Sequence, residues 1–274
     1  MKKPFFRIIS RLDIKNGYLI KGINLEGLRI LGDPANFSDL YYKQGIDEIC
    51  YVDNVATLYG TNNLSKFITR TAKTIFVPLT VGGGIRSISD IENMLNAGAD
   101  KVSINSAAID DEKFIYKASR LFGSSTISVN IEYIVYKGKT FITKSNGRDL
   151  VFIDPAEWAK KVEALGAGEI NITSVNFEGL QKGFDIKNIN RISGKIKIPI
   201  LAHGGCGGVN HVVDLIAKTN VSGVVIASYF HYDSISRFKK IKSKVGNTNF
   251  LENYKFVKKK NNLIQKIKKE LLKR

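Results

Sequence analysis

Cysteine, histidine and long apolar runs are all scarce in this sequence of 274 residues. Its two cysteines, Cys50 and Cys206, are too few for a disulfide framework. Its three histidines are scattered and have no metal-ligand spacing. These shortages argue against a small disulfide-stapled domain and against a structural zinc site, and we expect neither a metal nor a cofactor.

No apolar run approaches the roughly eighteen residues that a membrane span needs. The opening Met1-Lys2-Lys3-Pro4 also lacks the long apolar stretch of a secretion signal. With 43% hydrophobic and 24% charged residues, the composition is that of an ordinary globular protein. We therefore expect a cytoplasmic protein without membrane binding, built as one large α/β domain or two small ones.

Acidic residues are few, 25 against 42 lysines and arginines, which gives a net charge of +17. Residues 255–274 hold nine of the basic residues and one acid, Glu270, so eight of the seventeen net charges lie in the tail. The apolar residues of this segment would share one helical face; they are Leu263, Ile264, Ile267 and Leu271. We interpret residues 249–274 as a basic helical tail packed on the domain. The alternative is that this tail binds nucleic acid, but no aromatic-rich recognition motif supports it.

Two glycine-rich stretches, residues 80–86 and 202–207, each follow a short apolar run. About twenty residues after each, a second apolar run ends in a small polar pair, Asn105-Ser106 or Ala227-Ser228. The register is shared, because 204 − 82 and 228 − 106 both equal 122.

Glycine lets backbone N–H groups close around an anion, and a nearby hydroxyl or amide adds donors. Each stretch with its polar pair therefore predicts one phosphate cradle. The first cradle comprises Gly82, Gly83, Gly84, Asn105 and Ser106, and the second comprises Gly204, Gly205, Ala227 and Ser228.

Short β-type runs alternate with amphipathic segments along the chain. Strands are predicted near residues 5–13, 48–53, 76–81, 101–105, 126–132, 168–174, 198–202 and 223–227. Helices are predicted near 35–44, 63–74, 88–97, 109–121, 156–165, 185–194, 209–218 and 232–243. Eight such pairs indicate a closed (β/α)₈ TIM barrel over residues 1–248, and the repeat indicates two similar half-barrels. An open doubly wound sheet is the alternative.

Two acids, Asp13 and Glu132, end predicted strands at related positions of the two halves. Barrel active sites lie at the carboxyl ends of the strands, so we expect the acids to lie between the two cradles. They would act as general acid and general base, with environments that push their pKa values apart. A substrate with a phosphate at each end would span them. The alternative for each carboxylate is a structural cap.

Four charged residues lie instead at the opposite ends of predicted strands: Arg7, Glu48, Lys101 and Glu169. Alternating lysine, arginine and glutamate around a barrel bottom predicts at least a stabilising ring of ion pairs.

Several sequence motifs, in a fixed order along the chain, point to a known protein family. They are Arg7-Ile8-Ile9, Leu12 to Gly17, Lys21 to Asn24, Gly32-Asp33-Pro34, Gly82 to Arg86, Lys101 to Asn105, Gly166 to Ile170 and Ala202 to Gly207. On these motifs, residues 5–240 resemble the cyclase subunit of imidazole glycerol phosphate synthase, the synthase barrel of a glutamine amidotransferase.

The resemblance implies a lyase/cyclase that uses ammonia from a glutaminase docked on the barrel bottom. Its substrate would be a bisphosphorylated ribosyl compound of histidine biosynthesis. Asp13 matches a catalytic aspartate of the family, and Lys21 matches the lysine of a mobile first loop. The four charged residues at the bottom match the gate through which ammonia enters. Gly179 joins the predicted phosphate-binding residues.

The match departs from the family in three places. Glu132 and Glu178 stand where aspartates are usual, and Ser10-Arg11 replaces a Pro-Cys pair. In addition, residues 145–158 look closer to a paralogous branch that supplies ammonia to a sugar amidotransferase in surface-polysaccharide synthesis. The leading hypothesis is the cyclase-type synthase subunit, and the alternative is an ammonia-conducting subunit of the paralogous kind with little or no cyclase activity.

Overall fold

A computed structural model describes residues 6–54, 64–237 and 262–273 of the chain. Eight parallel strands close into a barrel in the order β1, β4, β5, β6, β7, β10, β11, β12, with β12 paired to β1 and β10 paired to β7. The barrel strands are β1 (Arg7–Lys15), β4 (Glu48–Asp53), β5 (Leu79–Gly82), β6 (Lys101–Ile104), β7 (Ile127–Tyr136), β10 (Glu169–Ser174), β11 (Ile200–His203) and β12 (Gly223–Ile226). The closed barrel is confirmed, and the open sheet is excluded.

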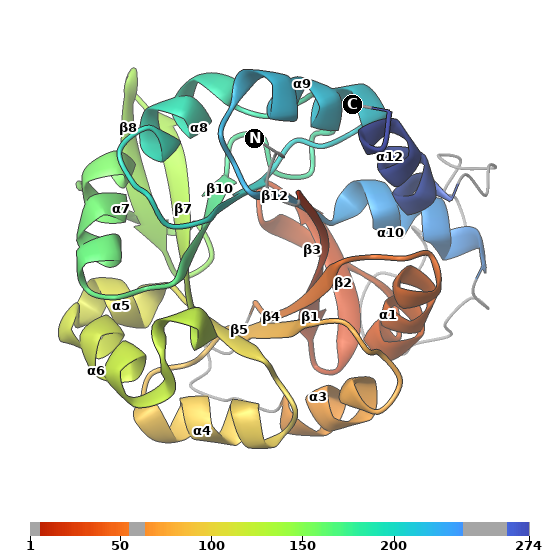
Figure 1. Cartoon of the computed structure of the whole chain (residues 1–274), viewed down its shortest axis with the longest axis horizontal. Helices are drawn as coiled ribbons and strands as arrows, with labels where there is room; N and C mark the ends of the chain where they lie inside the picture. The colour runs from red at the N-terminus through yellow and green to blue at the C-terminus, as the bar shows by residue number, and fades with distance from the viewer. Residues whose placement is uncertain (1–5, 55–63, 238–261, 274) are drawn as a thin grey trace.

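Helices form an outer ring around the strands (Figure 1). They are α1 (Pro34–Lys43), α3 (Ser65–Ala72), α4 (Ile88–Asn96), α5 (Ser106–Asp110), α6 (Lys113–Phe122), α7 (Pro155–Ala164), α8 (Ile186–Ser193), α9 (Val209–Lys218), α10 (Ser228–Ser234) and α12 (Leu263–Leu271). Short 3₁₀ turns lie at η1 (Ser124–Thr126) and η2 (Ile235–Arg237).

Local sequence signals explain where several helices begin. Asp33 and Asp154 accept backbone N–H groups as N-caps of α1 and α7, and a proline follows each of them at the first helical position. Ser87 and Asp90 form a reciprocal capping box at the start of α4. The apolar faces of these helices then pack on the outside of the barrel in one continuous core.

Some predicted boundaries are wrong. β5 and β11 begin three and two residues later than predicted, just after Pro78 and Pro199, which have no N–H to donate to a strand ladder. The helix predicted over 109–121 is two helices, α5 and α6. The last barrel helix, predicted from 232, begins at Ser228, and residues 238–243 of that prediction lie outside the described residues.

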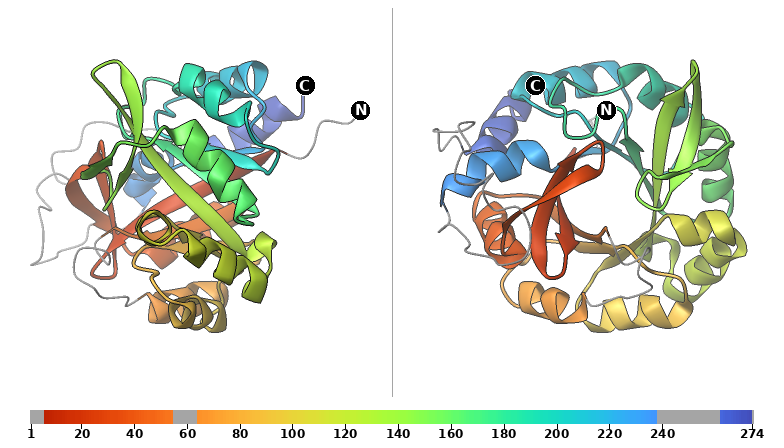
Figure 2. Two further views of the ribbon diagram at one scale, coloured as in Figure 1. Left: turned by 90° about the vertical axis from the view of Figure 1, so that its left-hand side faces the viewer. Right: turned by 180° about the vertical axis from the view of Figure 1, so that it is seen from behind.

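Two antiparallel extensions are absent from the sequence prediction. β2 (Tyr18–Ile23) and β3 (Glu26–Gly32) form a hairpin after β1, while β8 (Lys139–Lys144) and β9 (Asp149–Val151) extend from β7. The side view shows both extensions at the same end of the barrel (Figure 2). The β7–β8 turn had a signal in the Lys137-Gly138 pair, because glycine readily adopts the positive φ that a two-residue hairpin loop requires. In the structure the two residues have φ values of 48° and 77°.

The helix α12 lies beside α9 and α10 (Figure 1). Leu263, Ile264 and Ile267 are buried in the same core cluster as the barrel helices, and the Lys268 ammonium lies 2.6 Å from Asp47. The predicted packing of an apolar face in the tail is confirmed for residues 263–271. The predicted boundary between residues 248 and 249 lies outside the described residues.

Candidate active site

Strand β1 directs alternate side chains into the barrel and out toward the helices. Ile8 and Leu12 belong to the core shared with the helices, whereas Ile9 belongs to a separate buried cluster. That alternation places Arg11 and Asp13 on the inward face with Ile9. The inner cluster that surrounds Ile9 consists of Cys50, Leu201 and Val225, with the partly buried Val52 packed against it.

The charged residues at the amino ends of the strands form a closed ring of ion pairs. Arg7 Nη1 lies 3.0 Å from Glu48, and Arg7 Nη2 also contacts Glu169. Lys101 Nζ lies 3.1 Å from Glu48 and 3.5 Å from Glu169. Thr80 donates a hydrogen bond of 2.7 Å to Glu48. The four predicted residues therefore meet at the bottom of the barrel, below the apolar layer around Ile9.

At the other end, Asp13 lies between two cations. Its Oδ1 accepts a hydrogen bond of 2.8 Å from Arg11 Nε, and its Oδ2 lies 3.8 Å from Lys21 Nζ. All three side chains are almost completely buried. Burial alone would raise the pKa of Asp13, but the charges of Arg11 and Lys21 outweigh it and lower this pKa to about 2. Asp13 is therefore ionised at neutral pH.

Glu132 has a different environment, with neutral hydrogen-bond donors. Its Oε1 accepts 3.1 Å from Asn130 Nδ2, and its Oε2 accepts 3.0 Å from Gly147 N. Burial raises the pKa of Glu132 to about 6, against the opposing effects of Arg11 and the Gly147 N–H. The environments of the two acids thus push their pKa values apart, as an acid–base pair requires.

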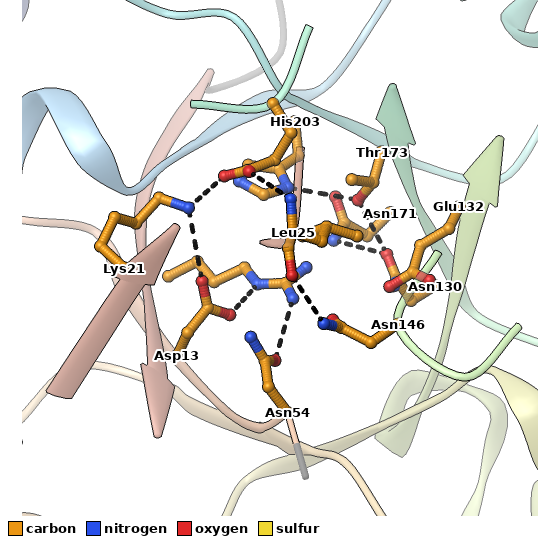
Figure 3. Close-up of polar contacts among 12 residues, drawn as sticks. Asp13, Lys21, Leu25, Asn54, Asn130, Glu132, Asn146, Asn171, Thr173 and His203 are labelled. Atoms are coloured by element: carbon orange, nitrogen blue, oxygen red, sulfur yellow. Dashed lines mark hydrogen bonds and ion pairs between the residues drawn. The ribbon is translucent and has the colours of Figure 1, made fainter. Parts of the chain in front are cut away.

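A buried polar network that the sequence analysis missed supports Glu132. Asn130 Oδ1 accepts from Asn171 Nδ2 at 3.0 Å and from Thr173 Oγ1 at 3.1 Å, and Thr173 Oγ1 lies 3.2 Å from His203 Nδ1 (Figure 3). Burial lowers the pKa of His203 well below its usual value, so this ring is neutral. Polar residues at every second position of otherwise apolar strands β7 and β10 were the available signal.

The β2–β3 hairpin is fastened across the top of the barrel. Lys21 on β2 contacts Glu178 in the segment after β10, and Glu178 Oε2 accepts 3.0 Å from Leu25 N. Asn24 adds two bonds, from its backbone N–H to Glu178 O and from Nδ2 to Val175 O, both 3.0 Å. Lys21 thereby lies close to Asp13, on the opposite side of the site from Glu132 in the close-up (Figure 3).

The first glycine cradle lines a cavity of about 470 Å³. Gly83 has φ of 93° and lies so close to the Asp53 backbone that a Cβ would stand 2.2 Å from the carbonyl oxygen. Only glycine fits there, as a close backbone approach predicts. Arg11, Glu132 and all five predicted residues of this cradle line the cavity; the five are Gly82, Gly83, Gly84, Asn105 and Ser106.

The second cradle repeats this geometry at the ends of β11 and β12. Gly204 has φ of 99°, and a Cβ on it would stand 2.7 Å from Ser174 O. Asn105 and Ala227 share an unusual backbone, with ψ of −86° and −85°. Gly83 approaches the Asp53 backbone as Gly204 approaches the Ser174 backbone, so the two glycines are equivalent. Both pairs are 121 residues apart, since 204 − 83 and 174 − 53 equal 121. This offset is one residue shorter than the 122 residues taken from the sequence. The structure thus repeats as two halves.

The predicted phosphate-binding residues do not all lie at one place. The second cradle, Gly204, Gly205, Ala227 and Ser228, is separate from the cavity that the first cradle lines. Gly179 lies against the hairpin, where a Cβ would stand 2.8 Å from Gly22 O. Its structural contact is therefore with β2.

The order of strands fixes how the parts face one another. β1 with Asp13 is diametrically opposite β7 with Glu132, and β5 and β6 are opposite β11 and β12. The two cradles therefore lie on opposite sides of the barrel, and the two acids lie on another pair of opposite strands, β1 and β7.

Within residues 6–54, 64–237 and 262–273, no cluster of three or more His, Cys, Asp or Glu side chains could hold a metal ion. None of the helices in the same ranges is both long enough and apolar enough to span a membrane.

These features define a class of protein: a (β/α)₈ barrel of two similar halves, with paired glycine cradles and paired acids at the carboxyl ends of its strands. The chain belongs to the family described as histidine biosynthesis protein, whose model matches residues 7–236.

Three relatives named imidazole glycerol phosphate synthase subunit HisF illustrate the similarity. The protein of Legionella pneumophila is 46% identical over 202 residues, which cover 73% of this chain and 95% of the relative. That of Lactococcus lactis subsp. cremoris (strain MG1363) is 44% identical over 228 residues, 82% of this chain and 88% of the relative. That of Bacillus cereus (strain G9842) is 43% identical over 227 residues, with 82% and 90% coverage.

Proposed function

We propose that this chain is the cyclase-type subunit of an imidazole glycerol phosphate synthase, a lyase-type enzyme of histidine biosynthesis. The observation that carries the proposal is the placement of Asp13 and Glu132 on opposite strands, between two repeat-related glycine cradles. The curated relatives carry the synthase name, which favours this function over the sugar-amidation alternative.

In this proposal, the cradles hold the two phosphates of a bisphosphorylated ribosyl substrate. Gly83 and Gly204 bring the backbone close to the phosphates, while Ser106 and Ser228 supply hydroxyl groups. The side-chain oxygen of Asn105 is buried without a hydrogen-bond partner among the described residues, and Asn105 lines the first cavity. A ligand hydroxyl group in the cavity would satisfy it.

Ammonia enters from a glutaminase subunit docked at the barrel bottom. The ring of Arg7, Glu48, Lys101 and Glu169 would act as the gate, and the apolar layer around Ile9 and Cys50 would form the path above it. A neutral molecule such as ammonia crosses an apolar layer at far lower cost than an ion. At the top, Asp13 and Glu132 flank the reacting atoms, and Lys21 on the hairpin closes the site.

The direct test supplies the purified chain with ammonium salt and the bisphosphorylated ribosyl substrate. Release of imidazole glycerol phosphate and the aminoimidazole carboxamide ribotide is expected. Asp13→Asn and Glu132→Gln should each lower kcat by about 100-fold or more with a smaller change in KM, because loss of a proton-transferring or charge-stabilising group at the reacting atoms typically costs ~10²–10⁴-fold. Asp39→Asn, which alters an exposed pair with Lys43, is the matched control and should retain the activity.

An absence of turnover above background with the folded chain would contradict the proposal. A subunit that only conducts ammonia to a sugar amidotransferase would then be favoured. In that case Asp13→Asn would leave glutamine-dependent sugar modification intact.

A further inference from the structure

Arg11 is the largest fully buried side chain among the residues that the structure describes, and the proposed reaction gives it no role. It lies on the inward face of β1, between the apolar layer of Ile9 and the carboxylate of Asp13. It lines the cavity of the first cradle together with Glu132. A guanidinium carries its charge at any physiological pH, so a permanent cation lies between the two acids.

Only one of the two acids, Asp13, accepts a hydrogen bond from this cation. Asp13 Oδ1 accepts the Arg11 Nε–H at 2.8 Å, a charge-assisted hydrogen bond within a single strand. Glu132 accepts instead from the neutral amides of Asn130 and Gly147, at 3.1 and 3.0 Å. In the close-up, Asp13 and Lys21 lie on one side and Glu132 and Asn130 on the other (Figure 3).

The remaining charged groups near Asp13 do not replace Arg11. Lys21 is farther from it, at 3.8 Å, and shares its ammonium with Glu178. His203 also faces Asp13, but burial keeps this ring neutral. The charges that act on Glu132 are those of Arg11 and Asp13, which have opposite signs and partly cancel. Arg11 is thus the closest charged partner of Asp13.

The orientation of Arg11 is itself constrained. Its Nη2 lies 3.5 Å from Asn54 Oδ1, on the segment that follows β4, while Nε holds Asp13. Two acceptors, one on β1 and one just after β4, therefore contact the same planar guanidinium group. Such a group fixes both the charge and the direction of the carboxylate that it holds.

We infer that Arg11 is a positioning residue that keeps Asp13 ionised and in one orientation, so that Glu132 is the carboxyl group that exchanges protons in the reaction. Asp13 then acts as a fixed anion beside any positive charge that forms on nitrogen. The role in the reaction rests on the proposed function, whereas the effect of Arg11 on Asp13 can be measured without turnover.

The test follows the carboxyl ¹³C resonances of Asp13 and Glu132 against pH, assigned with Asp13→Asn and Glu132→Gln. In the unaltered protein, Asp13 should not titrate above about pH 4, and Glu132 should titrate near pH 6. In Arg11→Met, which keeps the length and removes the charge, the midpoint of Asp13 should rise by about one pH unit or more. Arg11→Lys keeps a cation and should restore most of the difference.

Arg191→Met is the matched control, because it removes a guanidinium that pairs with Asp154 outside the site. It should move neither midpoint. An unchanged Asp13 midpoint in folded Arg11→Met overturns the inference. If Arg11→Met does not fold, the unaltered protein still decides, since titration of Asp13 at a higher pH than Glu132 also overturns it.

Where the chain is active, the pH profile of kcat/KM adds a readout that a purely structural role would not move. The charge of Arg11 also lowers the pKa of Glu132, so the acidic limb should shift upward in Arg11→Met and return toward its original position in Arg11→Lys. A lower maximum with an unmoved limb contradicts a role in ionisation. Absent turnover with the expected titrations contradicts the proposed function alone.

Discussion

Glu132 shows how one buried side chain would link the proposed catalysis to stability. Its pKa is raised from 4.5 to about 6, so the folded protein binds this proton more tightly than the unfolded chain does. The contribution of Glu132 to the stability of the folded state is therefore greatest below about pH 4.5, and it is lost as the pH rises through about 6. The loss amounts to about 2 kcal/mol. An ionisable group suited to proton exchange at neutral pH costs the fold some stability.

Glu132→Gln should remove this pH dependence, because glutamine does not ionise. Relative to the unaltered protein, the free energy of unfolding of the variant should gain about 2 kcal/mol between about pH 4.5 and pH 7.5. Urea unfolding at several pH values measures the difference. Glu157→Gln on the exposed face of α7 is the control, which should not gain stability over this range. Parallel stability curves for Glu132→Gln and the unaltered protein would contradict the assignment.

At the scale of elements, the β2–β3 hairpin depends on a buried ion pair. Lys21 and Glu178 are both about 1% exposed, and Glu178 also accepts the Leu25 N–H. Removal of one partner from a buried pair typically costs ~3–5 kcal/mol, because it leaves the other charge uncompensated. We expect this loss of stability to be confined to the hairpin, since the barrel strands are held by their own backbone hydrogen bonds to one another.

Glu178→Gln should therefore loosen the hairpin without unfolding the barrel. The Leu25 amide should exchange with deuterium at least about 100-fold faster, because local opening becomes ~3 kcal/mol easier. Hydrogen exchange followed by NMR measures the rate. Arg148→Gln removes an exposed pair with Glu26 on the same hairpin and should change the rate by less than about fivefold. Equal effects of the two variants would show that the buried pair does not hold the hairpin.

At the scale of the whole molecule, the barrel separates two ends with different chemistry. The lower end holds the ion-pair ring and the upper end holds the acids, with the apolar cluster of Ile9, Cys50, Leu201 and Val225 between them. This separation suits a reaction in which ammonia enters below and the substrate binds above.

Glu48→Gln tests whether the ion-pair ring at the lower end controls the delivery of ammonia to the upper end. Glu48 pairs with Arg7 and Lys101 and accepts from Thr80, so its neutralisation opens the ring on three sides. In the complex with the glutaminase, we expect at least about a tenfold fall in glutamine-driven turnover, while turnover with added ammonium salt stays within about twofold. The ratio of the two rates is the measurement, and Glu157→Gln, which weakens an exposed pair with Lys195, is the control. An unchanged ratio would reduce the ring to a stabilising role.

Much of this organisation could be predicted from the sequence. Apolar periodicity located the barrel strands, and the repeat of the glycine stretches placed the two cradles in equivalent halves. Asp13 and Glu132 were identifiable because strand ends carry the chemistry of a barrel. The hairpins were missed, since β2 is a short, mostly apolar run without regular alternation and β9 has only three residues.

The sequence by itself determined the class of fold and the residue types at the strand ends, because periodicity and glycine requirements are local properties. Only the tertiary structure decided which charges meet at the upper end of the barrel. It placed Arg11 against Asp13, Lys21 against Glu178, and Glu132 among neutral amides of β7 and the β8–β9 loop. Ionisation depends on burial and on neighbours brought from distant parts of the chain, so the difference in pKa between the two acids is a property of the closed barrel.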